Sequence, residues 1–520
     1  MPAPVISTVD ESGRTGWVAR APVSIARMST MIPRPVDLST VDAWSDEVDV
    51  LVVGAGMAGV CAALEAQAAG ARVLVIDKGG RLTCTSAMAG GHFYLGGGTP
   101  VQRATGWEDS PEAMAAYLRA TLPTCDPEKI RLYSEGSVEH FGWLEALGFE
   151  FERSYYERKT VVQPGTIGLL FTGNEKCWPF DQIAQPAPRG HKPPVPGDMG
   201  GAALVVGLAL DRLAERGVEV RYETGATALV TDGGAVAGVA WRSLDASGFI
   251  RAGAVVLAAG GFVMNQEMLE RYCPELMAVQ TNGMALGNTH DDGLGIRLGE
   301  SVGGVTENME KTFLTGPFYP PAEALKGIVV NKAGQRIVNE DAYHSRTTAA
   351  VFRQPDRTAY LIFDSATMVQ PRYRFQPLID GWETIEEMEK GLGIPEGALA
   401  QTMADYDRHA ADGDDPEFHK SSEYVVPLDQ GPWGAYDLTP GRCFYAGFSV
   451  GGLRVNPDGQ LLTADASTVP GVYAAGACAS NLAVDGDGYA SGTQLGGASF
   501  FGRRAGRHAA GHAAQDRAAA

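Results

Sequence analysis

Three glycines and one aspartate near the start of the chain have the types and the spacing that hold a dinucleotide. Gly54, Gly56 and Gly59 form a Gly-x-Gly-x-x-Gly run. The first glycine permits a tight turn, the second lets a pyrophosphate approach the backbone, and the third lets a helix pack closely on a strand. Asp77 follows about 20 residues on, where a carboxylate can accept hydrogen bonds from both hydroxyls of an adenosine ribose.

The residues around this motif predict the elements that must position it. Residues 50–53 are a short apolar run rich in β-branched side chains, as expected for a parallel strand buried on both faces. Residues 57–69 are rich in alanine and predict a helix that ends at Gly70 and turns its positive N-terminal end to the phosphates. Residues 72–76 predict the second strand, which delivers Asp77. Strand, helix and acidic residue together indicate a dinucleotide site.

The composition limits the class of protein. With 520 residues, 45% of them hydrophobic, the chain is long enough for two or more domains. A formal net charge of −20 argues against nucleic acid or an anionic membrane face as partner. The seven cysteines are scattered and include no Cys-x-x-Cys pair, which indicates reduced thiols, and the nine histidines have no metal-ligand spacing. We therefore expect a cytoplasmic protein without a structural metal.

The sequence also predicts whether the chain crosses a membrane and which segments lack regular secondary structure. No run approaches about 18 consecutive apolar residues, so we expect no transmembrane segment. Residues 1–45 lack the apolar run of a secretory signal and are expected to be a loosely ordered or partner-wrapping extension. Residues 155–200 are rich in proline and glycine and predict either a cover over a site or a solvated loop.

Later segments repeat the alternation of strands and glycine turns. Residues 226–230 and 236–241 predict a hairpin, and residues 254–262 predict a buried strand that ends at Gly260 and Gly261. From about residue 300 to 440 glycine turns become fewer, and helices are expected at 385–392 and 399–410.

These segments resemble the flavoproteins with two dinucleotide-binding domains, in particular the fumarate reductase and 3-ketosteroid dehydrogenase superfamily. The run from Gly79 to Gly91 is similar to the segment that lines the isoalloxazine, and residues 471–476 resemble the second flavin-binding strand and turn. The resemblance implies an α/β fold: a discontinuous Rossmann-like FAD-binding domain at 46–298 and 444–520, with an inserted α+β substrate-capping domain at 299–443.

Several segments resemble 3-ketosteroid Δ4-(5α)-dehydrogenases more specifically: 97–99, 109–110, 186–191, 339–343, 448–453 and 488–506. The likeness covers roughly residues 49–506. It implies that Tyr343, Tyr489 and Ser491 are catalytic, and that Phe448, Gly492 and Tyr489 contact the substrate. The sequence departs from the family pattern at Asp485-Gly486-Asp487 and at His344, which leaves the identity of the steroid less determined than the type of reaction.

The resemblance also implies the cofactor and the reaction. FAD would accept a hydride from C5 at N5, while C4 loses a proton, so that a 3-ketosteroid becomes a Δ4-3-ketosteroid in steroid catabolism. The electron acceptor and the oligomeric state stay open. The residues expected to contact FAD are Gly54, Gly56, Met57, Ala58, Gly59, Asp77, Lys78, Thr85, Ser86, Gly90, Gly91, Ala228, Gly260, Gly261, Asp292, Gly476, Ala477, Gly492 and Leu495.

The residue types suit this chemistry without the resemblance. Removing two hydrogens next to a ketone requires a hydride acceptor, a base for the acidic hydrogen, and donors that stabilise the enolate oxygen. Tyrosine and serine hydroxyls can donate or relay a proton without placing a full charge in an apolar site. The alternatives are that Tyr343 and Tyr489 are amphipathic core residues and that Ser491 is a helix N-cap.

Three other functions compete with this interpretation. A Δ1-dehydrogenase of the same superfamily would carry a Tyr-Pro-Gly-Pro-Gly turn near the C-terminus, which this chain lacks. A fumarate-type or urocanate-type reductase would use an arginine proton donor and cationic clamps, for which Arg346 and Arg503 are candidates. A non-enzymatic flavin carrier would need only an exposed flavin edge, so a large capping domain argues against it.

We predict that the FAD is bound tightly but non-covalently, because Cys84 stands in the loop where covalent relatives carry a histidine. Acid precipitation of the purified protein should release the yellow colour into the supernatant, measured by absorbance. Flavin that stays with the pellet would contradict the prediction.

Overall fold

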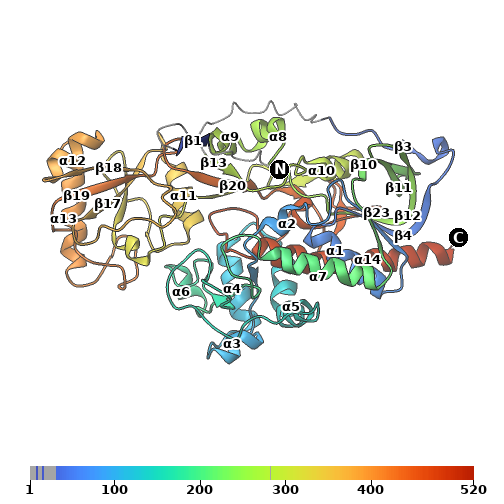
Figure 1. The fold of residues 1–520 in the computed structure, drawn as a ribbon, viewed down its shortest axis with the longest axis horizontal. Coiled ribbons are helices and arrows are strands. Elements are labelled where there is room, and N and C mark those ends of the chain that lie inside the picture. The colour runs from blue at the N-terminus through green and yellow to red at the C-terminus, as the bar shows by residue number, and fades with distance from the viewer. Residues whose placement is uncertain (1–7, 10–14, 17–30, 282, 520) are drawn as a thin grey trace.

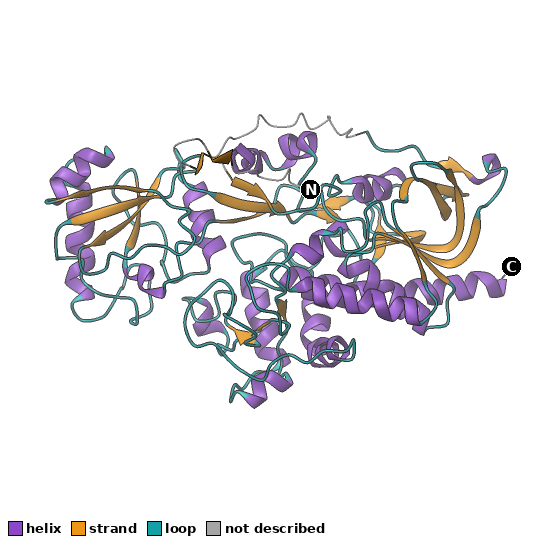
Figure 2. Ribbon diagram, viewed as in Figure 1, coloured by secondary structure: helices purple, strands orange, loops and turns teal. Residues whose placement is uncertain are grey.

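A nine-stranded sheet carries the dinucleotide motif in the computed structural model, which describes residues 8–9, 15–16, 31–281 and 283–519. At its centre β4 (Asp46–Val53) runs parallel to β5 (Val73–Ile76) on one side and to β12 (Ser247–Leu257) on the other. β12 also pairs in parallel with β23 (Thr468–Ala474), and β9 (Glu219–Arg221) extends the sheet beyond β5. The predicted α/β class is confirmed (Figures 1 and 2).

Three helices pack on this sheet and on one another: α1 (Met57–Ala68), α7 (Ala202–Glu215) and α14 (Thr493–Ala519). Glycines let α14 approach the helix of the dinucleotide motif. A Cβ atom on Gly506 would lie 2.0 Å from the carbonyl oxygen of Ala62, and one on Gly502 would lie 2.4 Å from that of Ala58. The C-terminal helix therefore belongs to the same layer as the N-terminal cofactor motif.

The predicted hairpin is present as β10 (Gly225–Asp232) and β11 (Ala235–Arg242), and it continues the sheet antiparallel to β12. β3 (Val36–Asp37) pairs with β10 at the edge of the sheet. This part of the expected N-terminal extension is thus a sheet strand, whereas most of residues 1–30 lie outside the described residues.

A lobe beneath the sheet contains α3 (Pro100–Ala104), α4 (Pro111–Thr121), α5 (Pro127–Glu145) and α6 (Phe180–Ile183), with a small sheet of β6 (Phe93–Tyr94), β8 (Gly190–His191) and β7 (Leu169–Leu170) (Figure 1). The irregular stretch 155–200 runs through this lobe. Asn174, Glu175 and Arg189 are each at most 1% exposed. These three residues lie in the protein interior, whereas Trp178, Ile183 and Met199 of the same stretch are 45%, 50% and 60% exposed, so the stretch is only partly buried.

Two further sheets extend away from the dinucleotide motif. β13 (Gly283–Ala285), β20 (Tyr445–Ser449) and β15 (Thr312–Thr315) form one of them, and α11 (His344–Phe352) packs on β15. The other contains β16 (Ile328–Asn331), β17 (Ala359–Asp364), β19 (Trp433–Asp437) and β18 (Leu378–Trp382), flanked by α12 (Ile385–Leu392) and α13 (Ala398–Ala410). Both predicted helices are confirmed, and the domain boundaries stay a prediction.

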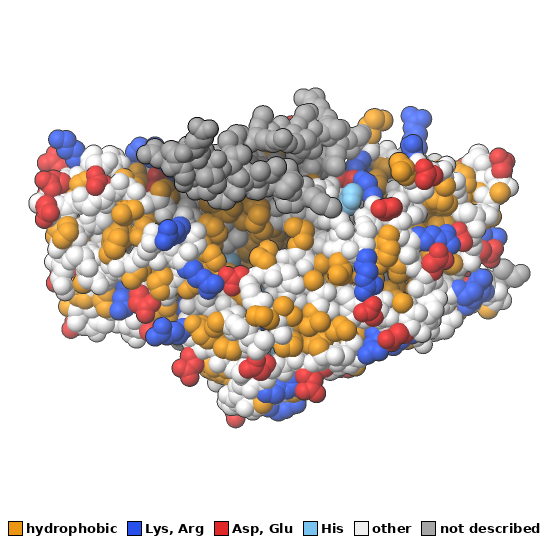
Figure 3. All heavy atoms as spheres, viewed as in Figure 1, with side chains coloured by type: hydrophobic (Ala, Val, Ile, Leu, Met, Phe, Trp, Pro, Cys, Tyr) orange, Lys and Arg blue, Asp and Glu red, His pale blue; other side chains and the backbone are white. Residues whose placement is uncertain are grey.

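The remaining elements are short: β1 (Thr8–Val9), β2 (Thr15–Gly16), α2 (Thr85–Met88), α8 (Gln266–Tyr272), α9 (Pro274–Thr281), α10 (Leu294–Ser301), β14 (Thr306–Glu307), β21 (Gly452–Leu453) and β22 (Gln460–Leu462), with 3-10 turns at Leu38–Thr40, Ala322–Lys326 and Gly476–Cys478. Across the described part of the chain, no helix has both the length and the hydropathy needed to cross a membrane. Hydrophobic side chains gather around a hollow in the middle of the face shown in Figure 3.

Candidate active site

The turn from β4 into α1 has the geometry that the glycine spacing predicts. Gly54 has a φ of 108°, and a Cβ atom there would lie 2.3 Å from the carbonyl oxygen of Ala258. A Cβ atom on Gly59 would lie 1.8 Å from the carbonyl oxygen of Gly54. By contrast, a Cβ atom on Gly56 would meet only Ser86 Oγ, at 3.5 Å. The first and third glycines are required by the fold, and the second has space beside it for a ligand.

Asp77 organises the ribose side of this turn. Its carboxylate accepts hydrogen bonds from the N–H groups of Ala55 at 2.5 Å and Gly79 at 2.6 Å. Burial raises the pKa of Asp77, and these two N–H groups oppose the rise. Because each carboxylate oxygen has a second lone pair, Asp77 can still accept hydrogen bonds from ribose hydroxyls.

The other predicted cofactor residues divide into two groups. The segments of Gly260, Gly261, Gly476 and Ala477 meet the motif at the carboxyl ends of β12 and β23: a Cβ atom on Gly261 would lie 3.6 Å from Ala477 Cβ, and one on Gly476 would lie 2.8 Å from Ala58 Cβ. Thr85 and Ser86 lie on α2, where the Ser86 hydroxyl accepts a hydrogen bond from Met57 N at 3.1 Å.

The second group is engaged mainly with protein. Gly90 and Gly91 pack against residues 198–202, since Cβ atoms there would lie 2.9 Å from Asp198 O and from Ala202 N. Ala228 lies on β10 opposite Ala240. Gly492 packs against the backbone of 92–94, and Leu495 is 8% exposed near the start of α14. Contact of this second group with the cofactor stays a prediction.

Two neighbouring acidic residues, Asp291 and Asp292, bond Thr85 and Lys78. Asp292 pairs with Lys78 Nζ at 2.8 Å and accepts a hydrogen bond from Leu294 N, the first residue of α10, at 2.8 Å. Asp291 accepts a hydrogen bond from the Thr85 hydroxyl. Burial raises the pKa of Asp291 to about 6. These contacts tie residues 288–293 to the residues of the dinucleotide motif and α2.

The residues present fit FAD. The N-terminal turn of α1 has no side-chain cap from Gly56, so most of its amide groups are free for phosphate oxygens. Open space lies beside Gly56, and Asp77 stands at the end of the next strand. Among the described residues, no cluster of three His, Cys, Asp or Glu side chains could hold a metal ion.

The three predicted catalytic residues lie together although they are far apart in the sequence. The Tyr343 hydroxyl and Ser491 Oγ form a hydrogen bond of 2.5 Å across 148 residues. Tyr343 precedes α11, and Ser491 lies two residues before α14. The partner of the Ser491 hydroxyl is therefore the Tyr343 phenol, which comes from a distant part of the chain.

Two residues of the irregular stretch hold this pair in place. Thr172 clamps Ser491, because Ser491 N donates to Thr172 O at 2.8 Å and the Thr172 hydroxyl donates to Ser491 O at 2.9 Å. Asn174 Oδ1 accepts a hydrogen bond from Tyr343 N at 2.8 Å. Sequence reasoning missed both residues, since a Thr-Gly-Asn run in an irregular stretch carries no signal of its own beyond marking a turn.

An apolar cluster surrounds the hydroxyl groups. Tyr489 packs against Phe313 with ring centroids 4.4 Å apart, and Phe448 stacks on the same Phe313 at 4.8 Å. The members of this apolar cluster are Phe313, Tyr343, Val450, Ala483 and Tyr489, with Leu286 and Phe448 at its edge. Phe313 was not predicted; Phe448 lies beside Tyr489, and its substrate role stays a prediction.

Burial sets the protonation of the site. It raises the pKa of Tyr343 and of Tyr489 far above the usual value, so both phenols stay neutral donors at ordinary pH. The His344 ring lies tilted by 40° against the Tyr343 ring with centroids 3.8 Å apart, and its Nδ1 bonds the Thr315 hydroxyl at 2.7 Å. Burial lowers the pKa of His344 to about 3, so this imidazole is also neutral.

The two arginines of the reductase alternative are engaged elsewhere. Arg346 faces Asp487 at 3.6 Å and the Phe180 ring at 5.2 Å. Arg503 pairs with Glu65 at 2.7 Å and with Glu139 at 3.1 Å, between α1, α5 and α14. Neither is part of the apolar cluster.

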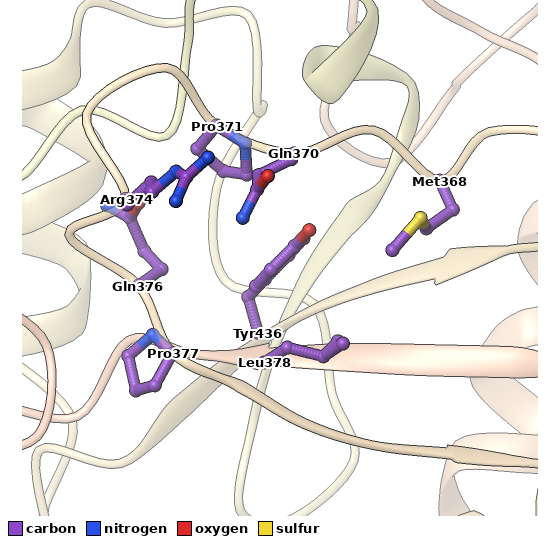
Figure 4. A pocket seen from close by; sticks show the side chains of 8 residues that line it. All are labelled: Met368, Gln370, Pro371, Arg374, Gln376, Pro377, Leu378 and Tyr436. Atoms are coloured by element: carbon purple, nitrogen blue, oxygen red, sulfur yellow. The ribbon is translucent and has the colours of Figure 1, made fainter. Parts of the chain in front are cut away.

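A separate groove of about 350 Å³ lies on the sheet of β18 and β19 (Figure 4). Its lining residues are Met368, Gln370, Pro371, Arg374, Gln376, Pro377, Leu378 and Tyr436. The groove contains none of the predicted site residues, so it is not the candidate active site.

Comparisons with known proteins identify the family of the chain. The FAD binding domain family matches residues 49–499. The chain is 38% identical to the structure of 3-ketosteroid-Δ4-(5α)-dehydrogenase from Rhodococcus jostii RHA1 in complex with 4-androstene-3,17-dione, with a TM-score of 0.86 over 92% of this chain and 99% of that chain. It is 28% identical to the 3-oxo-5-alpha-steroid 4-dehydrogenase of Comamonas testosteroni, over 83% of this chain and 93% of that one. It is also 28% identical to the fumarate reductase (cytochrome) of Shewanella frigidimarina, over 89% and 77% of the two chains.

Replacing the clamp on Ser491 tests whether Thr172 positions it. We expect Thr172→Val to fold and bind FAD but to slow flavin reduction by a saturated 3-ketosteroid about tenfold, because a buried carbonyl left without its donor costs about 1–3 kcal/mol and Ser491 can shift. Stopped-flow absorbance measures the rate. Thr367→Val is the matched control, since it removes a buried threonine hydroxyl that bonds Asp364 far from the site. Equal slowing in both variants would contradict the positioning role.

Proposed function

The chain belongs to the FAD binding domain family and is an FAD-dependent oxidoreductase, and we propose that it oxidises a saturated 3-ketosteroid to a Δ4-3-ketosteroid. The hydrogen bond of Tyr343 with Ser491 beside Tyr489, within the apolar cluster, carries this proposal. The Rhodococcus jostii enzyme, a 3-ketosteroid-Δ4-(5α)-dehydrogenase in complex with 4-androstene-3,17-dione, supports the substrate class.

Each hydroxyl has a part in the reaction. Bound FAD supplies the acceptor for the hydride that leaves C5. Tyr489 donates a hydrogen bond to the C3 oxygen, which makes the C4 hydrogen acidic and stabilises the enolate. Ser491 Oγ accepts the C4 proton and passes its own proton to the Tyr343 hydroxyl. Because a neutral serine is a weak base, it depends on this relay.

The surroundings favour neutral groups over charged ones. A steroid is almost entirely apolar, and the aromatic rings of Phe313 and Phe448 provide apolar surface for it. In a site of low dielectric constant, a fixed phenol donor stabilises an oxyanion more strongly than it would in water. The raised pKa of Tyr489 keeps that donor protonated over the physiological range.

The alternatives have less support. A dicarboxylate or urocanate substrate needs convergent cations, but Arg346 and Arg503 are held by Asp487 and by Glu65 with Glu139. A Δ1-dehydrogenation would attack the other side of the ketone, and the chain lacks the proline-containing turn of that family at 488–492. The chain is 22% identical to a 3-ketosteroid Δ1-dehydrogenase structure, and a likeness at this level shows the fold alone.

A substrate panel tests the reaction. We predict that a 5α-3-ketosteroid bleaches the flavin under anaerobic conditions without NAD(P), and that an artificial acceptor restores the colour. The product should be the Δ4-3-ketone, identified by mass spectrometry and its ultraviolet absorbance. Bleaching by NADH but by no ketosteroid, or a Δ1 product, would refute the proposal, while fumaric acid and urocanic acid serve as the reductase controls with pre-reduced enzyme.

Hydroxyl deletions test the assigned roles. We expect Tyr489→Phe to slow flavin reduction about 10²–10³-fold and Ser491→Ala about 10²–10⁴-fold, with FAD still bound. Tyr343→Phe should add little once Ser491 is gone, because the two act as one relay.

Tyr360→Phe is the matched control for these variants, since it removes a buried tyrosine hydroxyl that donates to Leu392 O in the sheet of β16 to β19. It should reduce at the parental rate. Parental rates in all three site variants would show that these residues are structural.

A further inference from the structure

Four buried polar atoms without hydrogen-bond partners lie behind the turn 488–492. Among the described residues they are Tyr94 OH, Asn174 Nδ2, Glu175 Oε1 and Arg189 Nη1. All four residues are at most 1% exposed. Tyr117 joins them: its hydroxyl accepts from Asn174 N at 2.8 Å, its ring stacks on Tyr94, and the Arg189 guanidinium lies 5.5 Å from its centroid. We refer to these five residues with Asp109 as the buried polar group.

The buried polar group adjoins the catalytic residues. Gly173 N donates to Glu175 Oε2 at 2.9 Å, and a Cβ atom on Gly173 would lie 2.8 Å from Ala490 Cβ, between Tyr489 and Ser491. The preceding Thr172 clamps Ser491, and the following Asn174 holds Tyr343 N. Glu175 is near enough to Tyr343 to add to the rise of its pKa.

The buried polar group contains two carboxyl groups for one guanidinium. Arg189 binds Asp109 with two hydrogen bonds, of 2.7 and 3.0 Å, and both side chains are 0% exposed. Asp109 therefore compensates the charge of Arg189 and leaves Glu175 without a cation of its own. Burial raises the pKa of Glu175, and Arg189 and the Tyr94 hydroxyl offset only part of that rise. The titratable groups that interact with Glu175 are Arg189, Tyr94, Tyr117, Tyr155, Lys176, Cys177 and Tyr343.

We propose that Glu175 receives the proton that leaves the substrate through Ser491 and Tyr343, by way of water bound between Tyr94, Asn174 and Arg189. A buried water makes about three hydrogen bonds to polar groups that otherwise lack partners, and the buried polar group offers four such atoms. This inference rests on the proposed function, since that reaction releases the proton.

The step balances as follows. The C5–H bond breaks with both electrons, which reduce FAD. The C4–H bond breaks and its proton moves to Ser491 Oγ, the serine proton moves to Tyr343, and the phenol proton moves through water to the Glu175 carboxylate. The electron pair of C4–H becomes the π bond of the new C4=C5 double bond. After the product leaves, the half-buried Ser491 contacts solvent. The proton then moves from Glu175 back through water, Tyr343 and Ser491 to the solvent.

A purely structural role predicts different behaviour. If Glu175 only accepted the hydrogen bond from Gly173 N, then Glu175→Gln would keep an acceptor oxygen of the same shape, and neither the rate nor its pH dependence would change beyond a loss of stability. If Glu175 accepts the proton, the rate rises with pH as the carboxyl ionises, and glutamine abolishes this rise.

The experiment measures anaerobic flavin reduction by a 5α-3-ketosteroid against pH in the holoenzyme and in two variants. Glu175→Gln should bind FAD, reduce about 10²-fold more slowly, and lose the rising limb of the pH profile. Tyr94→Phe should keep that limb and move it to higher pH, since the Tyr94 hydroxyl holds the pKa of Glu175 down. Glu389→Gln, a buried glutamate that accepts from Gly397 N and Ala400 N, is the matched control and should leave rate and profile unchanged.

Infrared difference spectroscopy gives a readout that does not depend on turnover. A pH titration of the substrate-free holoenzyme should show the carbonyl stretch of one protonated carboxyl group that is absent in Glu175→Gln, and substrate addition should increase it. The inference is overturned if Glu175→Gln keeps the parental rate and pH profile. If Glu175→Gln does not fold, it is overturned if the rising part of the pH profile of Tyr94→Phe stays at the parental pH. If no ketosteroid reduces the unmodified enzyme, the proposed function fails instead, and the titration alone still reports whether Glu175 exchanges its proton.

Discussion

The hydrogen bond between Tyr343 and Ser491 is the contact on which the site depends. It joins the start of α11 to the start of α14 across 148 residues, and neither hydroxyl is an adequate base by itself. Hydrogen bonds from a third part of the chain fix the two partners. Thr172 bonds the backbone of Ser491, and Asn174 bonds the backbone of Tyr343. The proposed relay of two neutral hydroxyls needs this placement, because proton transfer requires hydrogen-bond distances.

Low dielectric surroundings explain why the site uses hydroxyls. Burial raises the pKa of both tyrosines and lowers that of His344, so the apolar cluster holds neutral donors and acceptors only. Charged side chains near it are paired away from it, as Arg346 is with Asp487. Glu175 differs, since it is buried without a salt bridge among the described residues, and Gly173 between Thr172 and Asn174 donates a hydrogen bond to it.

Close backbone packing builds the cofactor end of the molecule. Gly54 and Gly59 bring β4, α1 and β12 into contact, and Gly502 and Gly506 bring α14 onto α1. The helix that follows Ser491 is therefore fixed on the helix of the dinucleotide motif. This common layer sets the position of Ser491 relative to that motif.

The sequence by itself determined the dinucleotide motif, its flanking strands and helix, the α/β class and the family, because glycine spacing and apolar periodicity are local properties that backbone sterics read directly. It also pointed to Tyr343, Tyr489 and Ser491, although only by resemblance. The tertiary structure alone decided that Tyr343 and Ser491 touch, that Thr172 and Asn174 hold them, and that residues 172–175 and 187–193 are buried. These features depend on contacts between distant segments and on desolvation, which no local spacing encodes.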